Sequence, residues 1–421
     1  MSATHPSSFR RSDPNAIRCL LAGTAMLLAC AGSRIAFAAD TTSPTGEATK
    51  AEQEATAANE SIDAEMPEEV IVFGRAAQQI GFAAAGSEGR VGHADLALRP
   101  IGRVGELLES VPGLIATQHS GTGKANQFFL RGFNLDHGTD FATFFDGVPV
   151  NFRSHGHGQG YTDLNFVIPE LVESIDYRKG PYRADVGDFG SAGASFLKTY
   201  DRLPDSFALT TYGQYDYVRG LAASSVEAGD GDLIFALEGR TNQDPYALDA
   251  KLLHLNGFTK WTGELGSGTL RASALGYHAK WNSTDQIPDR AIGSPDPAIH
   301  VSRLGYIDPD LGGDTTRVGA TLDWREDDET PLSASTYFLY YDFQLFSNFT
   351  YFLDNPVNGD QFEQGTGASR GAKARRPSCP SSSDVRSSSR PASRPISTAS
   401  RISACSGPTP ASASRSSAAM Q

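Results

Sequence analysis

Apolar and polar side chains alternate along the second half of the chain. Between residues 252 and 263, Leu253 and Leu255 fall on one face of an extended segment, and His254 and Lys260 fall on the other. Successive side chains of a strand point to opposite faces of a sheet. The pattern predicts seven antiparallel strands with one apolar and one polar face, at about 206–213, 221–228, 232–241, 252–263, 269–280, 314–326 and 332–345.

The connections between these strands alternate in length. Those at 229–231, 264–268 and 326–331 are tight, whereas those at 242–251 and 281–313 are longer. Short turns on one side and long loops on the other are typical of outer-membrane β-barrels. A water-soluble β-sandwich has no reason to sort its loops in this way, so the connections favour strands that cross a lipid bilayer.

Residues 76–200 show a different, mixed pattern. Helical spacing over 104–111 ends at Pro112 and Gly113, and a helical turn is predicted at 168–172. Short β-prone runs occur at 128–133, 141–150 and 174–178, and they are separated by turn residues. The sequence predicts a compact α/β domain before the sheet.

The N-terminus resembles an export signal. A basic lead with Arg10, Arg11 and Arg18 precedes a short apolar stretch at 19–30, and small residues at 36–38 offer a cleavage site. Residues 1–38 are therefore predicted to be a signal peptide, with lipidation of Cys30 as an open alternative. Residues 39–66 contain few apolar side chains that could be buried, so they are predicted to form a flexible linker.

Composition excludes several classes of function. The net charge of -13 argues against nucleic acid as a partner. The four cysteines lie in the signal segment and near the C-terminus, so neither disulfides nor cysteine-bound metal hold the body of the chain together. No catalytic motif is present, and we expect no enzymatic activity and no resident cofactor.

Several motifs, taken in order, resemble those of TonB-dependent outer-membrane receptors. The run Glu69, Val70, Ile71 and Val72 within residues 67–75 resembles the TonB box. The segments 107–114, 130–133, 146–149, 177–181 and 187–194 follow the order of that family's plug motifs. The resemblance implies a plug domain at 76–200 and the first part of a transmembrane β-barrel at 201–364.

The resemblance also implies a function. Receptors of this family take up scarce, bulky ligands across the outer membrane, often ferric siderophores or other metal complexes, with energy supplied through TonB. The expected partners are thus TonB, a small-molecule metal complex and outer-membrane lipid. The alternative is a secreted or periplasmic plug-like fragment that binds a metal or ligand without transporting it.

A histidine-rich loop within the predicted plug is a candidate ligand site. His155 and His157 are separated by one glycine, Arg153 is close by, and His119 and His137 lie in neighbouring loop-like stretches. Imidazole binds transition metals without help from thiols. Two interpretations stay open: a metal site, or histidines that only form hydrogen bonds within the loop.

Other plug residues are expected to have structural roles. Arg131 and Arg178 are predicted to be buried cations that need carboxylate partners, and Asp146 and Glu173 are the candidates. The remaining structural residues end strands or form turns, namely Gly132, Gly147, Gly180 and Pro181.

The predicted barrel is incomplete. A plugged barrel has about 22 strands, whereas the alternating pattern accounts for about 7–8 before it ends near Gln364. Residues 365–421 are rich in Arg, Ser, Ala and Pro and predict a disordered tail, which we interpret as a frame-shifted reading of a longer gene. The fold class expected is mainly β, an α/β plug followed by a partial antiparallel barrel.

Overall fold

The computed structural model describes residues 82–118, 122–283, 285–297, 299–306, 308–327, 332–357 and 359–377. The chain divides into two units, Met1–Phe73 and Gly74–Gln421, and all described residues belong to the second unit. The predicted signal peptide, linker and TonB box, as well as residues 378–421, lie outside the described residues. Among the described helices, none is both long and apolar enough to traverse a bilayer.

The first half of the described chain forms the predicted α/β domain, which we call the plug. Its six-stranded sheet has the order β1-β2-β8-β9-β6-β7, and a three-stranded sheet has the order β3-β4-β5. The plug elements are β1 (Phe82–Ala85), β2 (Glu88–Gly92), α3 (His93–Ala97), η1 (Val104–Ser110), β3 (Leu114–Thr117), β4 (Gln127–Leu130), β5 (Phe133–Asn134), β6 (Phe141–Phe145), β7 (Val148–Pro149), η2 (Pro169–Leu171), β8 (Val172–Lys179), η3 (Ala184–Val186) and β9 (Gly193–Thr199).

Two of the plug motifs are tight hairpin turns. Arg131 and Gly132 connect β4 to β5 with φ angles of 53° and 80°, and Asp146 and Gly147 connect β6 to β7 with φ angles of 44° and 79°. Two successive positive φ angles are the signature of the type I′ turn, whose twist matches that of paired strands. The second residue of each turn is glycine because it adopts this conformation without steric cost.

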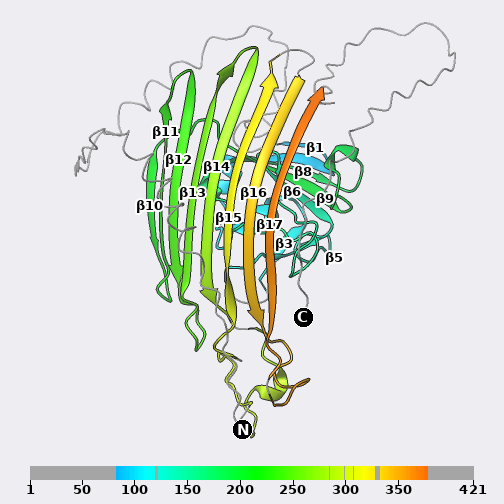
Figure 1. Cartoon of the computed structure of the whole chain (residues 1–421), viewed down its shortest axis with the longest axis vertical. Coiled ribbons are helices and arrows are strands. Elements are labelled where there is room, and N and C mark those ends of the chain that lie inside the picture. The colour runs from blue at the N-terminus through cyan, green and yellow to red at the C-terminus, as the bar shows by residue number, and fades with distance from the viewer. Residues whose placement is uncertain are drawn as a thin grey trace, which may run out of the picture. The chain divides into compact units, whose positions relative to one another are not determined.

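The second half of the described chain is one antiparallel sheet of eight strands in sequence order, β10 to β17 (Figure 1). Each strand pairs with the next along the chain, so β10 and β17 form its two edges. Successive connections alternate between short and long, as predicted. The strands are β10 (Phe207–Tyr212), β11 (Val218–Glu227), β12 (Gly231–Asn242), β13 (Leu252–Leu265), β14 (Gly268–Asn282), β15 (Gly312–Glu326), β16 (Leu332–Ser347) and β17 (Phe362–Pro377), with the short helix η4 (Asp289–Ala291) between β14 and β15.

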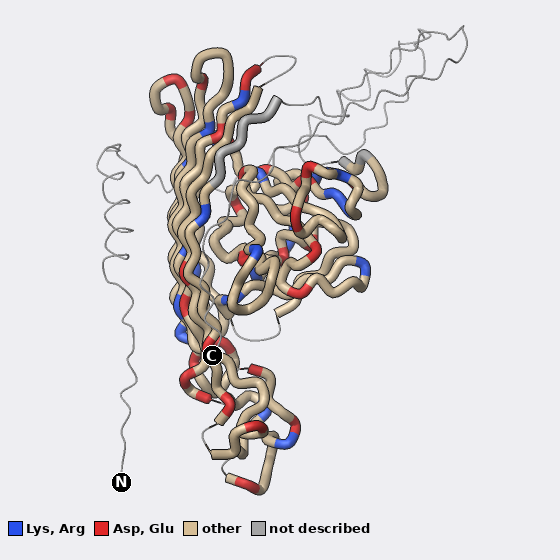
Figure 2. Tube along the Cα trace, turned by 45° about the vertical axis from the view of Figure 1, so that its right-hand side comes forward, with Lys and Arg blue, Asp and Glu red and all other residues tan. Residues whose placement is uncertain are grey.

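In this sheet polar side chains are buried and apolar side chains are exposed, which is the opposite of the arrangement in a water-soluble protein. On β13, the polar side chains of His254 and Lys260 are only 1% and 2% exposed, whereas Leu253 and Leu255 are 42% and 37% exposed. Charged residues gather mostly at the turns and connections, and much of the strand length is uncharged (Figure 2). An outward apolar face with a polar inner face is the arrangement of a transmembrane barrel wall. The faces predicted for β13 are confirmed.

Polar contacts join the inner face of the sheet to the plug. Asn256 Nδ2 donates to the carbonyl oxygen of Phe166 at 2.7 Å. Lys260 Nζ donates to both the carbonyl and the hydroxyl oxygen of Thr199, each at 3.1 Å. Polar residues of the alternating pattern on β13 therefore bind the plug.

Strand β17 extends beyond the end of the predicted barrel segment. Its register runs from Phe362 opposite Ser347 to Pro377 opposite Leu332. The strand therefore includes residues 365–377, which the sequence analysis assigned to a disordered tail. Backbone groups satisfy the open edge of β16 whatever side chains they carry, and this explains why the loss of alternation after Gln364 does not end the strand.

Candidate ligand-binding site

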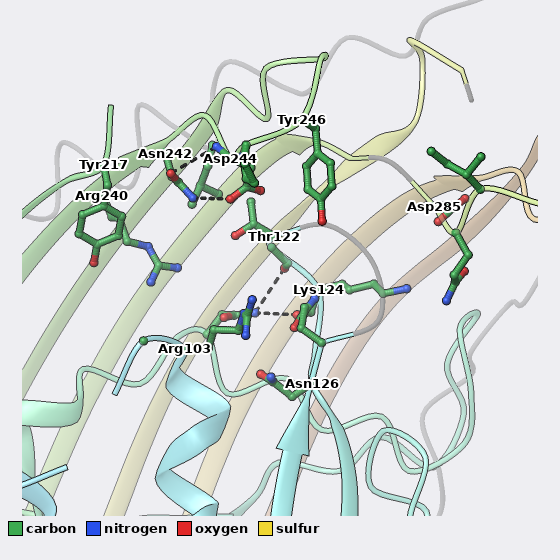
Figure 3. A pocket seen from close by; sticks show the side chains of 18 of the residues that line it. Arg103, Thr122, Lys124, Asn126, Tyr217, Arg240, Asn242, Asp244, Tyr246 and Asp285 are labelled. Carbon is green, nitrogen blue, oxygen red and sulfur yellow. Dashed lines mark hydrogen bonds between the residues drawn. The ribbon is translucent and has the colours of Figure 1, made fainter. Parts of the chain in front are cut away.

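A cavity of about 820 Å³ lies where the plug meets the long connections of the sheet (Figure 3). Its plug side is formed by the residues that precede η1 and by the segment that follows β3. Its other side comes from the ends of β12 and β13 and from the connections after β10, β12 and β14. This volume is within the range of sites that hold small-molecule ligands.

The plug side of the cavity is held by hydrogen bonds between side chains and the backbone. Gly102 N and Arg103 N donate to Glu106 Oε2 at 2.8 and 3.1 Å, which fixes the start of η1. Asn165 Nδ2 donates to the carbonyl oxygens of Gly123 and Lys124, both at 3.3 Å. Arg103 and Lys124 are thereby presented to the cavity from anchored backbone.

Lys124 is the most unusual residue of the cavity. Its side chain is almost fully buried, with 3% exposed, and Nζ has no hydrogen-bond partner among the described residues. Burial lowers the pKa of Lys124 to about 8, although the carboxylates of Asp285 and Asp136 act in the opposite direction. A buried ammonium group without a partner is costly, so the position favours an incoming anion.

The sheet side of the cavity is polar and aromatic. Asn242 Nδ2 donates to Asp244 Oδ1 at 2.6 Å, and the Tyr246 ring extends toward the plug residues in Figure 3. Asp285 is buried, with one carboxylate oxygen accepting from Asn348 N at 2.6 Å, and burial raises its pKa.

Cations outnumber carboxylates in the cavity lining. The four cations are Arg103, Lys124, Arg240 and Arg303, and the two carboxylates are Asp244 and Asp285. Since like charges in a concave site add their potentials, the cavity attracts an anionic ligand. None of these six residues was singled out from the sequence, although Lys124 follows a run of Gly, Ser and Thr that indicates an exposed loop.

The structure brings two of the four grouped histidines, His137 and His157, together, and His157 N donates to His155 Nδ1 at 3.1 Å. The His155 ring stacks on Tyr161, with centroids 3.9 Å apart and planes 4° apart, whereas His157 Nε2 lies 3.1 Å from His137 Nε2. Burial lowers the pKa of His155 to about 3. His119 lies outside the described residues. Within the described ranges, no group of three or more His, Cys, Asp or Glu side chains is arranged to hold a metal ion.

The predicted cations have other partners than those expected. Arg131 is exposed at its hairpin turn, and Arg178 is partly exposed and pairs with Asp185 at 2.9 Å, above the ring of Phe196. Arg153, which does not line the cavity, is 66% exposed and pairs with Asp188 at 2.6 Å.

Asp146 and Glu173, the carboxylates expected to pair with these arginines, bind other groups. Asp146 accepts from the backbone N and the hydroxyl of Thr199 at 2.9 and 2.6 Å, because its turn faces the end of β9. Glu173 pairs with Lys198 at 2.7 Å. The prediction that Arg131 and Arg178 pair with Asp146 and Glu173 is therefore wrong. Gly180, with a φ of 89°, and Pro181 end β8 as expected.

Comparison with known proteins identifies the fold of both halves. Residues 82–194 match the family described as TonB-dependent Receptor Plug Domain. The chain is 16% identical to the ferric-catecholate import receptor Fiu of E. coli K12 in its closed form, with a TM-score of 0.51, covering 69% of this chain and 43% of that one. It is 17% identical to the unliganded ferric citrate transporter FecA, with a TM-score of 0.51, covering 63% and 41%.

A third solved structure, the copper transporter OprC, is 13% identical with a TM-score of 0.49, and the match covers 71% of this chain and 44% of that one. The chain spans less than half the length of each of these structures. Residues 82–194 are thus similar to the plug domain of TonB-dependent receptors, and an antiparallel sheet of eight strands follows them in the chain.

Proposed function

We propose that this chain is part of a receptor that imports an anionic metal chelate, with a ferric siderophore or ferric citrate as the favoured class. The observation that carries the proposal is Lys124, a buried ammonium group that faces a cavity in which cations outnumber carboxylates. Two solved structures of the same fold are described as a ferric-catecholate receptor and a ferric citrate transporter. In this proposal, Glu69–Val72 would contact TonB.

Substitution of Lys124 with methionine is expected to weaken the binding of ferric citrate at pH 7 by about 10–100-fold. A hydrogen bond to a charged group contributes about 1.5–3 kcal/mol, and methionine keeps most of the buried volume. Quenching of tryptophan fluorescence on titration of the full chain in detergent micelles measures the affinity. The wild-type affinity should also fall as the pH rises from 7 to 9, because Lys124 loses its charge near pH 8 rather than near its usual value of 10.5.

Lys251→Met is the matched control, because Lys251 is exposed and does not line the cavity. Its affinity should equal that of the wild type. Ferrioxamine B, a cationic iron chelate, should bind weakly to all three proteins. Equal affinity for ferric citrate in the Lys124 variant, or preference of the wild type for the cationic chelate, would reject an anionic ligand at this site.

We further propose that β10–β17 are the first strands of a larger barrel. The described sheet ends at two edges, β10 and β17. An unpaired edge in hydrocarbon leaves N–H and C=O groups unsatisfied, and each such group costs several kcal/mol. A closed wall needs further strands between these edges.

The chain by itself is therefore expected to lack the resistance to SDS that closed barrels show. Electrophoresis of samples refolded in detergent, with and without boiling, should give one band at a single position. A faster-migrating band in the unboiled sample would show that these strands close on themselves, and the proposal of a larger barrel would then fail.

A further inference from the structure

Two imidazole rings from separate plug segments lie next to each other, and one of them contacts the backbone of Asn126, which lines the cavity. His137 follows β5 and His157 lies in the connection after β7, and their Nε2 atoms are 3.1 Å apart. The ring centroids are 4.7 Å apart with planes inclined at 56°, so the rings meet by their edges rather than by stacking. His137 is buried and His157 is partly buried.

The outer nitrogen of each ring is directed at an oxygen that can only accept. His137 Nδ1 lies 3.0 Å from the carbonyl oxygen of Asn126, and His157 Nδ1 lies 2.8 Å from Gln364 Oε1. The Gln364 amide is oriented by its own Nε2, which donates to the carbonyl oxygen of Gly156 at 3.1 Å. Both rings must therefore carry their proton on Nδ1 to form these bonds.

This proton arrangement leaves a lone pair on each Nε2 of the neutral rings, and the two Nε2 atoms lie 3.1 Å apart. Two imidazole nitrogens this close can bind one positively charged ion that lies to the side of the line joining them. The spacing of 3.1 Å lies between about 2.9 Å and about 3.3 Å, the separations of ligands at a right angle and at a tetrahedral angle when metal–nitrogen bonds are about 2.0–2.1 Å. A metal-binding histidine commonly donates its other ring N–H to a carbonyl group, and both rings do so here.

A third potential donor lies at the rim of this pair. Asp136 Oδ1 is 3.8 Å from His137 Nε2, and the Asp136 side chain is 48% exposed. A carboxylate at that distance adds negative charge beside the pair, and solvent can complete the coordination of an ion held by the two imidazoles. Tyr161 packs against both rings, with centroids 5.6 Å from His137 and 5.7 Å from His157, and restricts their movement.

We propose that His137 and His157 form a binding site for a divalent transition-metal ion that prefers imidazole, namely Cu²⁺, Ni²⁺ or Zn²⁺, with Asp136 at its rim. Affinity should be highest for Cu²⁺, in line with the general order of divalent ions at nitrogen ligands. The site links two parts of the molecule, since Asn126 also lines the cavity and Gln364 belongs to β17. It does not depend on the ligand proposed for the cavity.

Calorimetric titration of the untagged full chain in detergent micelles with CuCl₂ and ZnCl₂ tests this site. His137→Gln combined with His157→Gln should weaken the binding of Cu²⁺ at least 100-fold, and His157→Gln alone should weaken it at least 10-fold. Gln364→Leu keeps both ligands and removes only the acceptor of His157, and the loss of such a supporting contact costs about 10–100-fold in affinity.

His300→Gln is the matched control, because His300 is an exposed histidine on the connection between β14 and β15. It should bind Cu²⁺ as the wild type does, and the electron paramagnetic resonance spectrum of the wild type should show coupling to two imidazole nitrogens. Circular dichroism must show that the single His157 variant is folded. Unchanged Cu²⁺ affinity in the folded His157 variant, or a two-nitrogen spectrum that persists in the double variant, would overturn the proposal.

Discussion

Replacing Arg219 with methionine is expected to lower the free energy of unfolding by about 3–5 kcal/mol, the usual cost of breaking a buried ion pair by removing one partner. Arg219 on β11 forms two hydrogen bonds with Glu170 of η2, at 2.6 and 2.9 Å, and one with Glu238 of β12 at 2.6 Å. Glu238 is 2% exposed. Without Arg219, the ion-pair partner left to this carboxylate in the described part of the chain is His254, at 3.3 Å, which carries a charge only when its ring is protonated.

Urea titration of the full chain in micelles, followed by circular dichroism, measures this loss. Arg202→Met is the matched control, because Arg202 also binds two carboxylates but is 54% exposed. Exposed pairs contribute about 0–1 kcal/mol, so the two variants should differ several-fold in effect. Equal small losses in both would mean that Arg219 does not attach the plug to the wall.

Replacing Leu237 with arginine is expected to destabilise the folded chain in lipid by about 2–4 kcal/mol, the range for an arginine on the lipid face at the middle of the bilayer. Leu237 lies midway along β12, is 43% exposed, and pairs in register with Gly257 of β13. The guanidinium group at this position would lie in hydrocarbon. Urea titration in phosphatidylcholine vesicles measures the change.

The control for this substitution is Leu265→Arg at the end of β13, where Leu265 is 54% exposed. Near the membrane surface the same change costs about 0–1 kcal/mol. If the Leu237 variant were as stable as the wild type, the outer face of the sheet would not contact lipid, and the inverted burial would need another explanation.

The strands were predictable because their signal is local and repeats. His254, Asn256 and Lys260 alternate with apolar neighbours on β13, and this periodicity alone separates the inner from the outer face. The same holds for the hairpins at Gly132 and Gly147, where the residue type is dictated by a positive φ. The end of β17 was not predictable, because an edge strand supplies backbone partners to any sequence.

The cavity was not predictable from the sequence. Arg103, Lys124, Arg240 and Arg303 come from distant segments without a shared motif, and only the packing of the plug against the wall brings them together. The arrangement of the histidines was predictable only in part, since closeness in the sequence suggested that the rings of His155 and His157 would act together. The aromatic ring of Tyr161 stacks on His155, and the partner of His157 is 20 residues away along the chain.

The outward leucines and phenylalanines of the wall also bear on how the polypeptide reaches its destination. Phe235 and Phe338 are 40% and 51% exposed, and exposure of such apolar side chains is favourable in lipid but not in water. Between export and insertion the chain crosses an aqueous compartment, where contiguous apolar patches promote aggregation. Overproduction of the chain in water, away from lipid, is therefore expected to yield aggregates rather than soluble protein.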